Sequence, residues 1–335
     1  MLFSVIVPIY KISSEELHRA LASVLNQEFK DLELILIDDG SPDLCGEICD
    51  MYKEKYENIK VFHTPNRGVS AARNTGVENA SGKWIVFLDP DDCFVEDAFN
   101  TFCSTVNNSE SDIFCFDYKI FTSKGIRNNC FFNNEFKFYD NNDKLPLYLQ
   151  LFDFKKTPEM FTGIGVPWGK IYKRELLKDN QLSFNPEYRR MQDNVFNMYA
   201  FEKAKKIIYI KKPVYVYNIS NVKKIKSKYD NKICSYYELI LNERRAFTDN
   251  VYQSNIEIKK AYNRSLLKML VRASIRGIIL DSNQPNKKKK YEEYCKKILG
   301  YKYPVRTNFK YDFLFYLLKN PNSILLLRFL MLLKV

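Results

Sequence analysis

The stretch Trp84-Ile-Val-Phe-Leu-Asp-Pro-Asp-Asp92 decides how the rest of the chain is interpreted. Its unbroken apolar run is typical of a strand buried on both faces, and the carboxylates Asp89, Asp91 and Asp92 follow where that strand ends. In an open parallel sheet, ligands bind at this end of the strands. Closely spaced carboxylates repel one another, and a divalent cation with oxygen ligands relieves the repulsion. Taken alone, the stretch fits either such a cation site or a polar turn that caps a helix.

The composition indicates a folded protein with two regions of different charge. The chain has 335 residues, 46% of them hydrophobic, which is enough for two domains and a large core. Residues 1–218 carry 27 basic and 31 acidic side chains, whereas residues 219–335 carry 25 basic and 9 acidic ones. We therefore expect a nearly neutral catalytic domain at 1–218 and a basic helical region at 219–335, which suits a polyanion or an anionic membrane face.

Cysteine usage and the N-terminal sequence indicate a reducing compartment. The eight cysteines form no Cys-x-x-Cys pair and only two histidines accompany them, so we expect no zinc site. The sequence enters a strand-like run at Phe3 without the basic and apolar segments of a secretory signal. These features predict a cytoplasmic protein with free thiols.

The C-terminal stretch Phe313 to Val335 is strongly apolar but is interrupted by Lys319, Pro321 and Arg328. It contains no run of roughly 18 apolar residues, the length that would predict a spanning helix. Two interpretations remain open. One is a helix lying in the membrane interface, and the other is a helix packed onto the protein or onto a second subunit.

Apolar runs alternate with amphipathic segments through the first hundred residues. Ser13 and Glu16 form a capping-box pattern that predicts a helix start after the first strand. This alternation favours an α/β fold with a mostly parallel sheet and flanking helices. The expected strands are 3–10, 32–37, 59–63 and the run from Trp84.

Polar side chains follow three of these strands, at Tyr10, at Asp38-Asp39 and at Asp89 to Asp92. The carboxyl ends of parallel strands meet at one edge of a sheet, so we expect one crevice there. An aromatic ring can stack on a planar base, and an aspartate can accept hydrogen bonds from that base or from a ribose. Arg67 and Arg73 follow the third strand and could offset diphosphate charge. Each residue alone also fits a structural role in a core, a cap or a surface.

Five motifs, which follow one another along the chain, resemble those of the inverting family-2 glycosyltransferases of GT-A fold. The resemblance is close over roughly the first 100 residues and weaker to about 218, where Val166-Pro-Trp-Gly-Lys-Ile-Tyr and Gln192-Asp193-x-x-Phe196 continue it. The five motifs are Val7-Pro-Ile-Tyr10, Ser23-Val-Leu-Asn-Gln27, Asp38-Asp-Gly-Ser41, Asn66-x-Gly-x-x-x-Ala-Arg-Asn-x-Gly76 and Leu88-Asp-Pro-Asp-Asp92.

The resemblance implies a role for each matching position. It implies that the nucleotide sugar is bound by Pro8, Tyr10, Asp39, Arg73 and Asp89, the metal by Asp91, and that Asp193 is the general base. Supporting or acceptor-side positions are Asp38, Asp92, Trp168, Lys170 and Gln192. Gln192 replaces the glutamate of the family's usual Glu-Asp pair, so one carboxylate is absent.

These features predict a Mn²⁺- or Mg²⁺-dependent inverting transferase that moves a sugar, with UDP as the expected nucleotide, to a hydroxyl of a glycan or lipid-linked glycan. A metal stabilises the charge that develops on the leaving diphosphate, and a carboxylate accepts the proton of the attacking hydroxyl. We expect the protein to act in a bacterial cytoplasm, at the inner face of the plasma membrane, in the synthesis of capsule or cell-wall polymer. Whether it forms homo-oligomers is left open. The alternatives are an inactive nucleotide-sugar-binding scaffold and a nucleic-acid-binding protein, and the second is opposed by the Asp clusters and the lack of a recognition motif.

Overall fold

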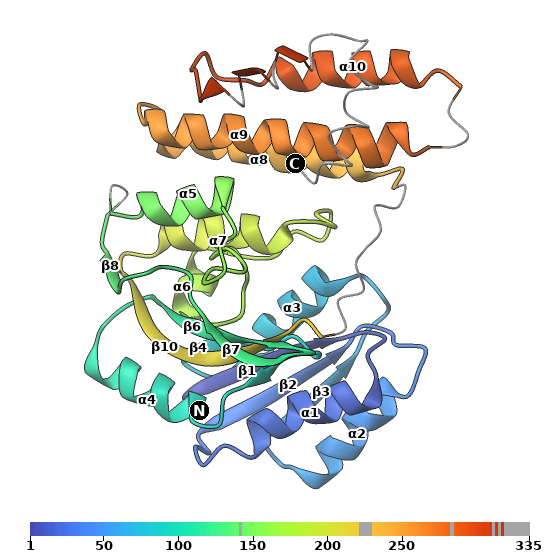
Figure 1. Cartoon of the computed structure of the whole chain (residues 1–335). Coiled ribbons are helices and arrows are strands. Elements are labelled where there is room, and N and C mark those ends of the chain that lie inside the picture. The colour runs from blue at the N-terminus through green and yellow to red at the C-terminus, as the bar shows by residue number, and fades with distance from the viewer. Residues whose placement is uncertain (141–142, 221–229, 282–284, 310–311, 314–315, 318–335) are drawn as a thin grey trace. The chain divides into compact units, whose positions relative to one another are not determined.

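The computed structural model describes the whole chain except residues 141–142, 221–229, 282–284, 310–311, 314–315 and 318–335. The described residues form two compact units (Figure 1). The first unit contains Met1–Lys144 and Lys155–Val222. The second contains Leu145–Phe154 and the described residues after Val222.

The first unit is built on one mixed sheet in the strand order β3-β2-β1-β4-β9-β6-β10-β5. Its parallel part consists of β1 (Phe3–Ile9), β2 (Leu32–Asp38), β3 (Ile59–His63) and β4 (Trp84–Phe87). In register, Val5 of β1 lies opposite Leu34 of β2 and Val86 of β4. Every residue of β1, β2 and β4 is buried, as expected for strands covered on both faces. The predicted mostly parallel sheet with flanking helices is confirmed.

Helices α1 (Ser14–Leu25), α2 (Cys45–Lys55) and α3 (Val69–Glu78) connect these strands. Ser13 is the N-cap of α1, as predicted, because its hydroxyl accepts a hydrogen bond from the Glu16 backbone N–H at 3.3 Å. The same hydroxyl donates to the Glu16 carboxylate at 2.6 Å. Helix α3 packs against β1 and β2, where Gly76 lies so close to Ile6 that a Cβ at position 76 would meet its side chain at 2.3 Å.

The other strands of the sheet come later in the chain, and several of them pair antiparallel to their neighbours. Strand β9 (Lys170–Lys173) runs antiparallel between β4 and β6 (Ile113–Thr122), and β10 (Ile207–Asn218), which sequence patterning did not predict, pairs parallel with β6. The remaining elements of this unit are β5 (Cys93–Phe94), α4 (Ala98–Asn108), β7 (Gly125–Asn129), β8 (Phe136–Phe138), α6 (Arg174–Asp179) and α7 (Gln192–Lys203).

The second unit is helical. It contains α5 (Leu145–Asp153), α8 (Ile233–Val251), α9 (Ile256–Ser274), a π-helical turn η1 (Ile275–Ile279) and α10 (Lys287–Leu299). Asp153 at the end of α5 forms ion pairs with Arg264 and Lys268 of α9, and the buried Arg244 of α8 donates to the Leu151 carbonyl at 2.7 Å.

These contacts place α5 differently from the sequence analysis, which put all of residues 1–218 in one domain. The apolar face of α5, including Tyr148 and Phe152, is buried among the later helices, with Tyr148 against Phe247 and Tyr252. Because the residues that cover α5 lie about a hundred positions later in the chain, the local sequence could not show to which unit this helix belongs. The units in the structure divide after Val222, four residues beyond the expected boundary.

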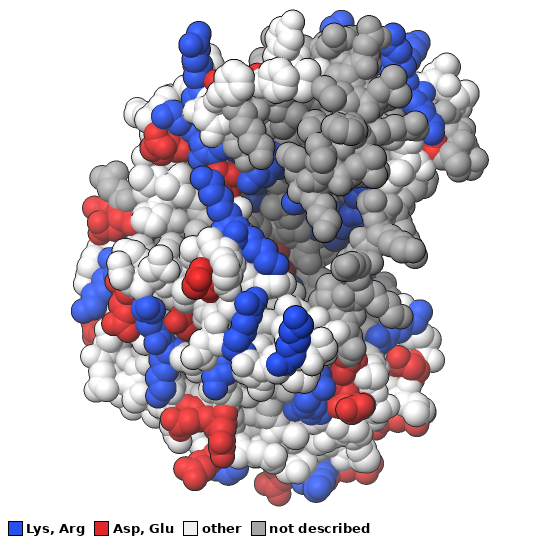
Figure 2. All heavy atoms as spheres, viewed as in Figure 1, with Lys and Arg blue, Asp and Glu red and all other residues white. Residues whose placement is uncertain are grey.

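Basic side chains are frequent on the helical unit. In the face shown in Figure 2, blue side chains outnumber red ones over its helices. In α10, Lys289, Lys290 and Lys296 are exposed, and the aromatic side chains of Phe309, Phe313 and Tyr316 follow with 86%, 51% and 71% of their surface exposed. Most of the apolar stretch from Phe313 to Val335 lies outside the described residues. In the part of the chain that the structure describes, no helix combines the length and the apolarity needed to cross a membrane.

Candidate active site

The ends of β1, β2 and β4 surround one cavity of about 570 Å³ in the first unit. The parallel register brings these strand ends together, as the sequence analysis predicted. Residues of α3, of the first turn of α7 and of the loop before α7 complete the wall. The lining residues are Pro8, Ile9, Tyr10, Asp39, Asn66, Gly68, Val69, Ala72, Arg73, Asp89, Pro90, Asp91, Arg189, Gln192 and Asp193.

The two aspartates at the end of β2 point to different partners. Asp39 lines the cavity and accepts the backbone N–H groups of Arg67 at 2.9 Å and Gly68 at 2.7 Å. Gly68 has a φ of 91°, a conformation that favours glycine, so the turn can present both N–H groups to one carboxylate. Asp38 lies outside the cavity lining and accepts from the Ser41 backbone and from His63.

The pKa values of Asp38 and His63 move in opposite directions. Burial raises the pKa of Asp38, but hydrogen bonds from Ser41 and His63 outweigh it and leave this pKa below its usual value. The hydrogen bonds to Asp38 and Asp50 raise the pKa of His63. Asp38 therefore holds the turn after β2 through Ser41 and connects it to His63 of β3.

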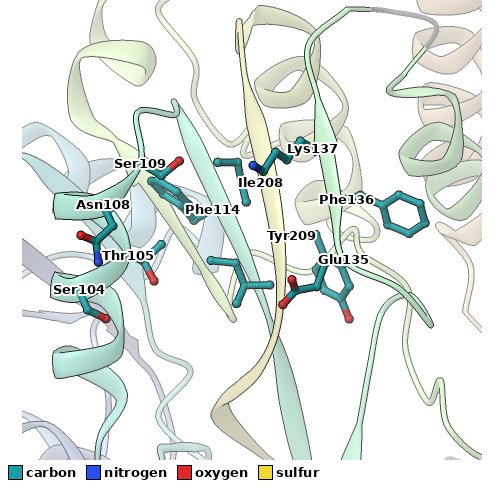
Figure 3. A pocket seen from close by; sticks show the side chains of 11 residues that line it. Ser104, Thr105, Asn108, Ser109, Phe114, Glu135, Phe136, Lys137, Ile208 and Tyr209 are labelled. Carbon is teal, nitrogen blue, oxygen red and sulfur yellow. The ribbon is translucent and has the colours of Figure 1, made fainter.

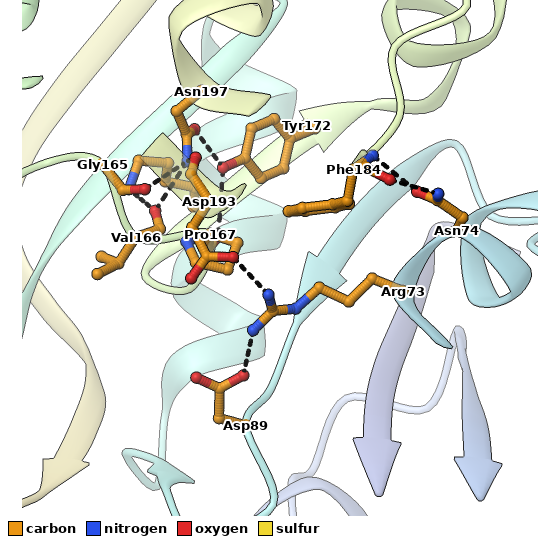
Figure 4. A network of polar contacts seen from close by, with 11 residues as sticks. Arg73, Asn74, Asp89, Gly165, Val166, Pro167, Tyr172, Phe184, Asp193 and Asn197 are labelled. Atoms are coloured by element: carbon orange, nitrogen blue, oxygen red, sulfur yellow. Dashed lines mark hydrogen bonds and ion pairs between the residues drawn. The ribbon is translucent and has the colours of Figure 1, made fainter. Parts of the chain in front are cut away.

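Arg73 of α3 joins two carboxylates that are 104 positions apart in the sequence (Figure 4). Its Nη1 lies 2.5 Å from Asp193 Oδ1, and its Nη2 lies 2.7 Å from Asp89 Oδ1. Burial lowers the pKa of the guanidinium, but Asp193 and Asp89 outweigh it, so the pKa of Arg73 is raised and the group stays charged. Arg73 therefore neutralises two of the site's own carboxylates, and it also lines the cavity.

Asp193 lies in the first turn of α7, after Met191, whose φ is 57°. Burial raises the pKa of Asp193, the positive charge of Arg73 opposes this, and the negative charge of Asp89 adds to the increase. One turn later, the buried Asn197 donates to the Gly165, Val166 and Asp193 carbonyls and accepts from the Tyr172 hydroxyl at 2.8 Å (Figure 4). Asn197 thus fixes the start of α7 against the segment before β9.

The three carboxylates after β4 have three different environments. Asp89 lines the cavity, and its backbone N–H donates to the Tyr215 hydroxyl at 3.1 Å. Asp91 also lines the cavity, and burial together with the charge of Asp89 raises its pKa to about 6. Asp92 is buried outside the lining, where it accepts from the Tyr215 hydroxyl at 2.8 Å and the Asn218 backbone N–H at 2.7 Å. Burial raises the pKa of Asp92 well above its usual value.

Trp168 and Lys170 do not line the cavity. The ring of Trp168 is stacked on Tyr215 with centroids 4.7 Å apart and an interplanar angle of 2°, so it supports the tyrosine that holds Asp89 and Asp92. Lys170 is fully buried, donates to the Val166 carbonyl at 2.6 Å, and has its pKa lowered to about 8 by burial. Both residues, expected at supporting or acceptor-side positions, are buried and do not reach the cavity wall.

Sequence reasoning missed several lining residues. Asn66, Gly68 and Ala72 belong to one of the five motifs but were given no role, and Arg189 was not singled out. The available signal for Arg189 was its position, four residues before Asp193 in a short basic pair. Arg67, considered for a diphosphate, has an exposed side chain outside the lining and contributes only its backbone N–H to Asp39.

A second cavity of about 630 Å³ lies in the same unit, between α4, β8 and the first residues of β6 and β10 (Figure 3). Its walls include Ser104 and Asn108 of α4, Lys137 of β8 and Ile208 of β10. Because β6 runs in the same direction as β1, this cavity lies toward the opposite edge of the sheet from the acidic strand ends. It contains one carboxylate, Glu135, so we place the chemistry in the smaller cavity.

The fold and the acidic cavity at its strand ends define a glycosyltransferase domain of GT-A fold. Residues 4–179 match the family model described as Glycosyl transferase family 2. The match covers more than half of the chain, and the chain therefore belongs to this family, as the motifs indicated.

Comparisons with individual proteins agree with this family. Glycosyltransferase GlyA of Streptococcus pneumoniae is 33% identical over 221 residues, which cover 64% of this chain and 30% of that protein. A poly(ribitol-phosphate) beta-glucosyltransferase of Bacillus spizizenii is 31% identical over 211 residues, 62% of this chain and 30% of that protein. The match thus spans less than a third of the length of these two relatives. Among solved structures, S. aureus TarS 1-349 in complex with UDP-GlcNAc has a TM-score of 0.67 at 22% identity, covering 97% of this chain and 88% of TarS 1-349.

Proposed function

We propose that this chain is an inverting glycosyltransferase that moves a sugar from a UDP-sugar to a hydroxyl of a glycan or lipid-linked glycan. The observation that carries the proposal is the Arg73 bridge, which holds the donor-side Asp89 and the base Asp193 on one wall of one cavity. The structure of TarS with UDP-GlcNAc supports the choice of a uridine nucleotide for a chain of this fold.

The donor nucleoside would bind at the ends of β1 and β2. Tyr10 has 44% of its surface exposed at the cavity wall, so its ring is available to stack on uracil. The Asp39 carboxylate accepts two backbone N–H groups and retains lone pairs for a hydrogen bond from the base. Pro8 lines the same wall, and Asp89 would accept from the ribose or the donor sugar.

The residues present fit a divalent cation bound together with a diphosphate. Asp89 and Asp91 both line the cavity, and burial together with the charge of Asp89 raises the pKa of Asp91, so a cation beside these two carboxylates would offset their repulsion. The described residues contain no cluster of three or more His, Cys, Asp and Glu side chains that could hold a metal, so phosphate oxygens would have to supply further ligands. We propose that Asp91, with Asp89, holds Mn²⁺ or Mg²⁺. Such a cation stabilises the charge that the leaving diphosphate acquires.

Asp193 would accept the proton of the acceptor hydroxyl. Arg73 favours the ionised form of this carboxylate against the effect of burial, which a base requires before it can take a proton. No second carboxylate acts as a nucleophile in a single displacement, so the anomeric configuration inverts. Gln192, next to Asp193, also lines the cavity, and we propose that it faces the acceptor.

We further propose a bacterial cell-wall or capsular glycan as the acceptor. The support is the set of relatives, which includes the minor teichoic acid biosynthesis protein GgaA of Bacillus subtilis, 46% identical over 114 residues, or 31% of this chain. The basic α10 and the exposed aromatic side chains of Phe309, Phe313 and Tyr316 support contact with the anionic inner face of the membrane, where lipid-linked glycans are made. A chain that stays in the supernatant with anionic liposomes at low salt would contradict this contact.

The decisive test is a panel of nucleotide sugars offered to the purified protein with Mn²⁺, read by donor hydrolysis and by thermal stabilisation. We expect UDP-sugars to stabilise the protein and one of them to be turned over when a glycan acceptor is added. Stabilisation without turnover for any acceptor would instead favour the inactive scaffold, and no stabilisation by any nucleotide sugar would overturn the proposal.

A further inference from the structure

The cavity contains two arginines whose charges are used differently. Arg73 is buried and gives one N–H to each of Asp89 and Asp193. The exposed guanidinium of Arg189 lines the cavity and forms no ion pair with any residue that the structure describes. The charge of Arg73 is already shared between two carboxylates. The positive charge that remains available to a ligand in this cavity is therefore that of Arg189.

The guanidinium of Arg189 has a defined position at the turn that holds Asp39. Its Nη1 lies so close to Gly68 that a Cβ added there would meet it at 2.4 Å. Gly68 is also the residue whose N–H donates to Asp39 at 2.7 Å. Arg189 therefore extends from the α7 side of the cavity to the β2 side.

The loop that carries Arg189 is fastened to α3. The side chain of Asn74 donates to the Phe184 carbonyl at 2.7 Å and accepts the Phe184 N–H at 2.8 Å, so one amide satisfies both backbone groups (Figure 4). The buried ring of Phe184 also packs against the Arg73 guanidinium, 5.3 Å from its centroid. The segment leading to Arg189 is thus anchored to the same helix that carries the Arg73 bridge.

We propose that Arg189 binds a phosphate group of the substrate. A guanidinium presents paired N–H donors that match phosphate oxygens, and here it breaks no ion pair to do so. The wall it faces carries the carboxylates of Asp39, Asp89, Asp91 and Asp193, so a phosphate entering without this charge would meet mainly acidic groups. The phosphate belongs either to the nucleoside diphosphate donor or to a phosphate-bearing acceptor glycan. This inference rests on the proposed function for the identity of the substrate, but not for the chemistry of the contact.

The test compares the wild type with Arg189→Ala and Arg189→Lys, and uses Arg127→Ala as a control that removes an exposed arginine outside the cavity. Calorimetry with UDP, UMP, uridine and inorganic pyrophosphate, at fixed Mn²⁺, measures the contact directly. If the donor is the source, Arg189→Ala weakens UDP and pyrophosphate binding about tenfold or more and leaves uridine binding unchanged, with Arg189→Lys in between. If the acceptor is the source, UDP binding is unchanged and KM rises for a phosphate-bearing acceptor but not for a phosphate-free one.

An equal loss for uridine and UDP, or an equal effect of Arg127→Ala, would overturn the proposal. So would unchanged values for UDP, pyrophosphate and both acceptors. Thermal unfolding of each variant separates a lost contact from a lost fold. The pyrophosphate measurement does not depend on the base, so a wild type that binds pyrophosphate but no uridine nucleotide would reject the proposed donor while still testing Arg189.

Discussion

Replacing Arg73 with glutamine tests whether this arginine keeps Asp193 ionised. Glutamine can donate to one carboxylate but carries no charge, so Asp89 and Asp193 would face each other without compensation. Arg73 is buried, but the two carboxylate side chains are 24% and 27% exposed, so the loss of unfolding free energy should lie below the about 3–5 kcal/mol that breaking a fully buried ion pair costs. Losing an adjacent opposite charge raises the pKa of a carboxyl by about 1–3 units.

The rate should change in a way that depends on pH. With the pKa of Asp193 raised further, a smaller fraction of the base is ionised at neutral pH, so kcat/KM at pH 7 should fall, by about tenfold for each unit by which the new pKa exceeds 7. The acidic limb of the pH profile should move to higher pH, and raising the pH should restore part of the rate. Arg73→Lys, which keeps the charge, should shift the limb less.

The assay is the pH dependence of kcat/KM for the wild type and both variants, with thermal unfolding measured in parallel. The double variant Arg73→Gln, Asp193→Asn serves as the control in the unfolding measurement, because with Asp193 made neutral the loss of the Arg73 charge should destabilise the fold less than it does in the single variant. A folded Arg73→Gln variant whose acidic limb coincides with that of the wild type would refute the reasoning.

Three further predictions concern single carboxylates. Asp193→Asn should abolish transfer while UDP binding by calorimetry stays within about twofold, and unaffected turnover would reject this base. Because the pKa of Asp91 is about 6, protons compete with the cation, so the apparent Kd for Mn²⁺ with UDP should rise about tenfold from pH 7 to pH 5, and Asp91→Asn should remove this dependence. Glu33, buried beside Ser4, Ser81 and Lys60, has its pKa lowered from 4.5 to about 2: burial raises it, but the Lys60, Ser4 and Ser81 contacts outweigh this. Its ionised form should therefore contribute about 3 kcal/mol above pH 4.5 and lose this as pH falls toward 2. In urea unfolding at pH 7, Glu33→Gln should be less stable than the wild type by this amount. A difference in unfolding free energy that does not narrow in acid would contradict the prediction.

The part of the site formed by consecutive strands was predictable from sequence. Tyr10, Asp39, Asp89 and Asp91 each follow a recognisable buried strand, and parallel pairing alone brings such positions to one edge. Asp193 was placed only through the family resemblance, and the structure brings it to the same cavity.

The partners of these residues could not be predicted, because they are set by packing between distant segments. No local pattern shows that Arg73 bridges Asp89 and Asp193, since the pairing depends on how α7 docks beside α3. Trp168 was expected at a supporting or acceptor-side position because of its motif, but its stacking on Tyr215 could not be foreseen from the sequence. The arginine that remains available, Arg189, precedes a helix in a loop whose course is fixed by contacts with α3.

The hydrogen bonds of the Tyr215 hydroxyl affect how segments can be exchanged between members of the family in chimeric proteins. It accepts from the Asp89 N–H and donates to Asp92, so the acidic loop after β4 is held by a residue on β10, more than 120 positions later. The segment by which the family is recognised ends at residue 179, before Asp193, the proposed base, and before this tyrosine. A chimera that grafts the acidic loop from another member should therefore retain metal and nucleotide binding only if β10, through Asn218, is transferred from the same parent.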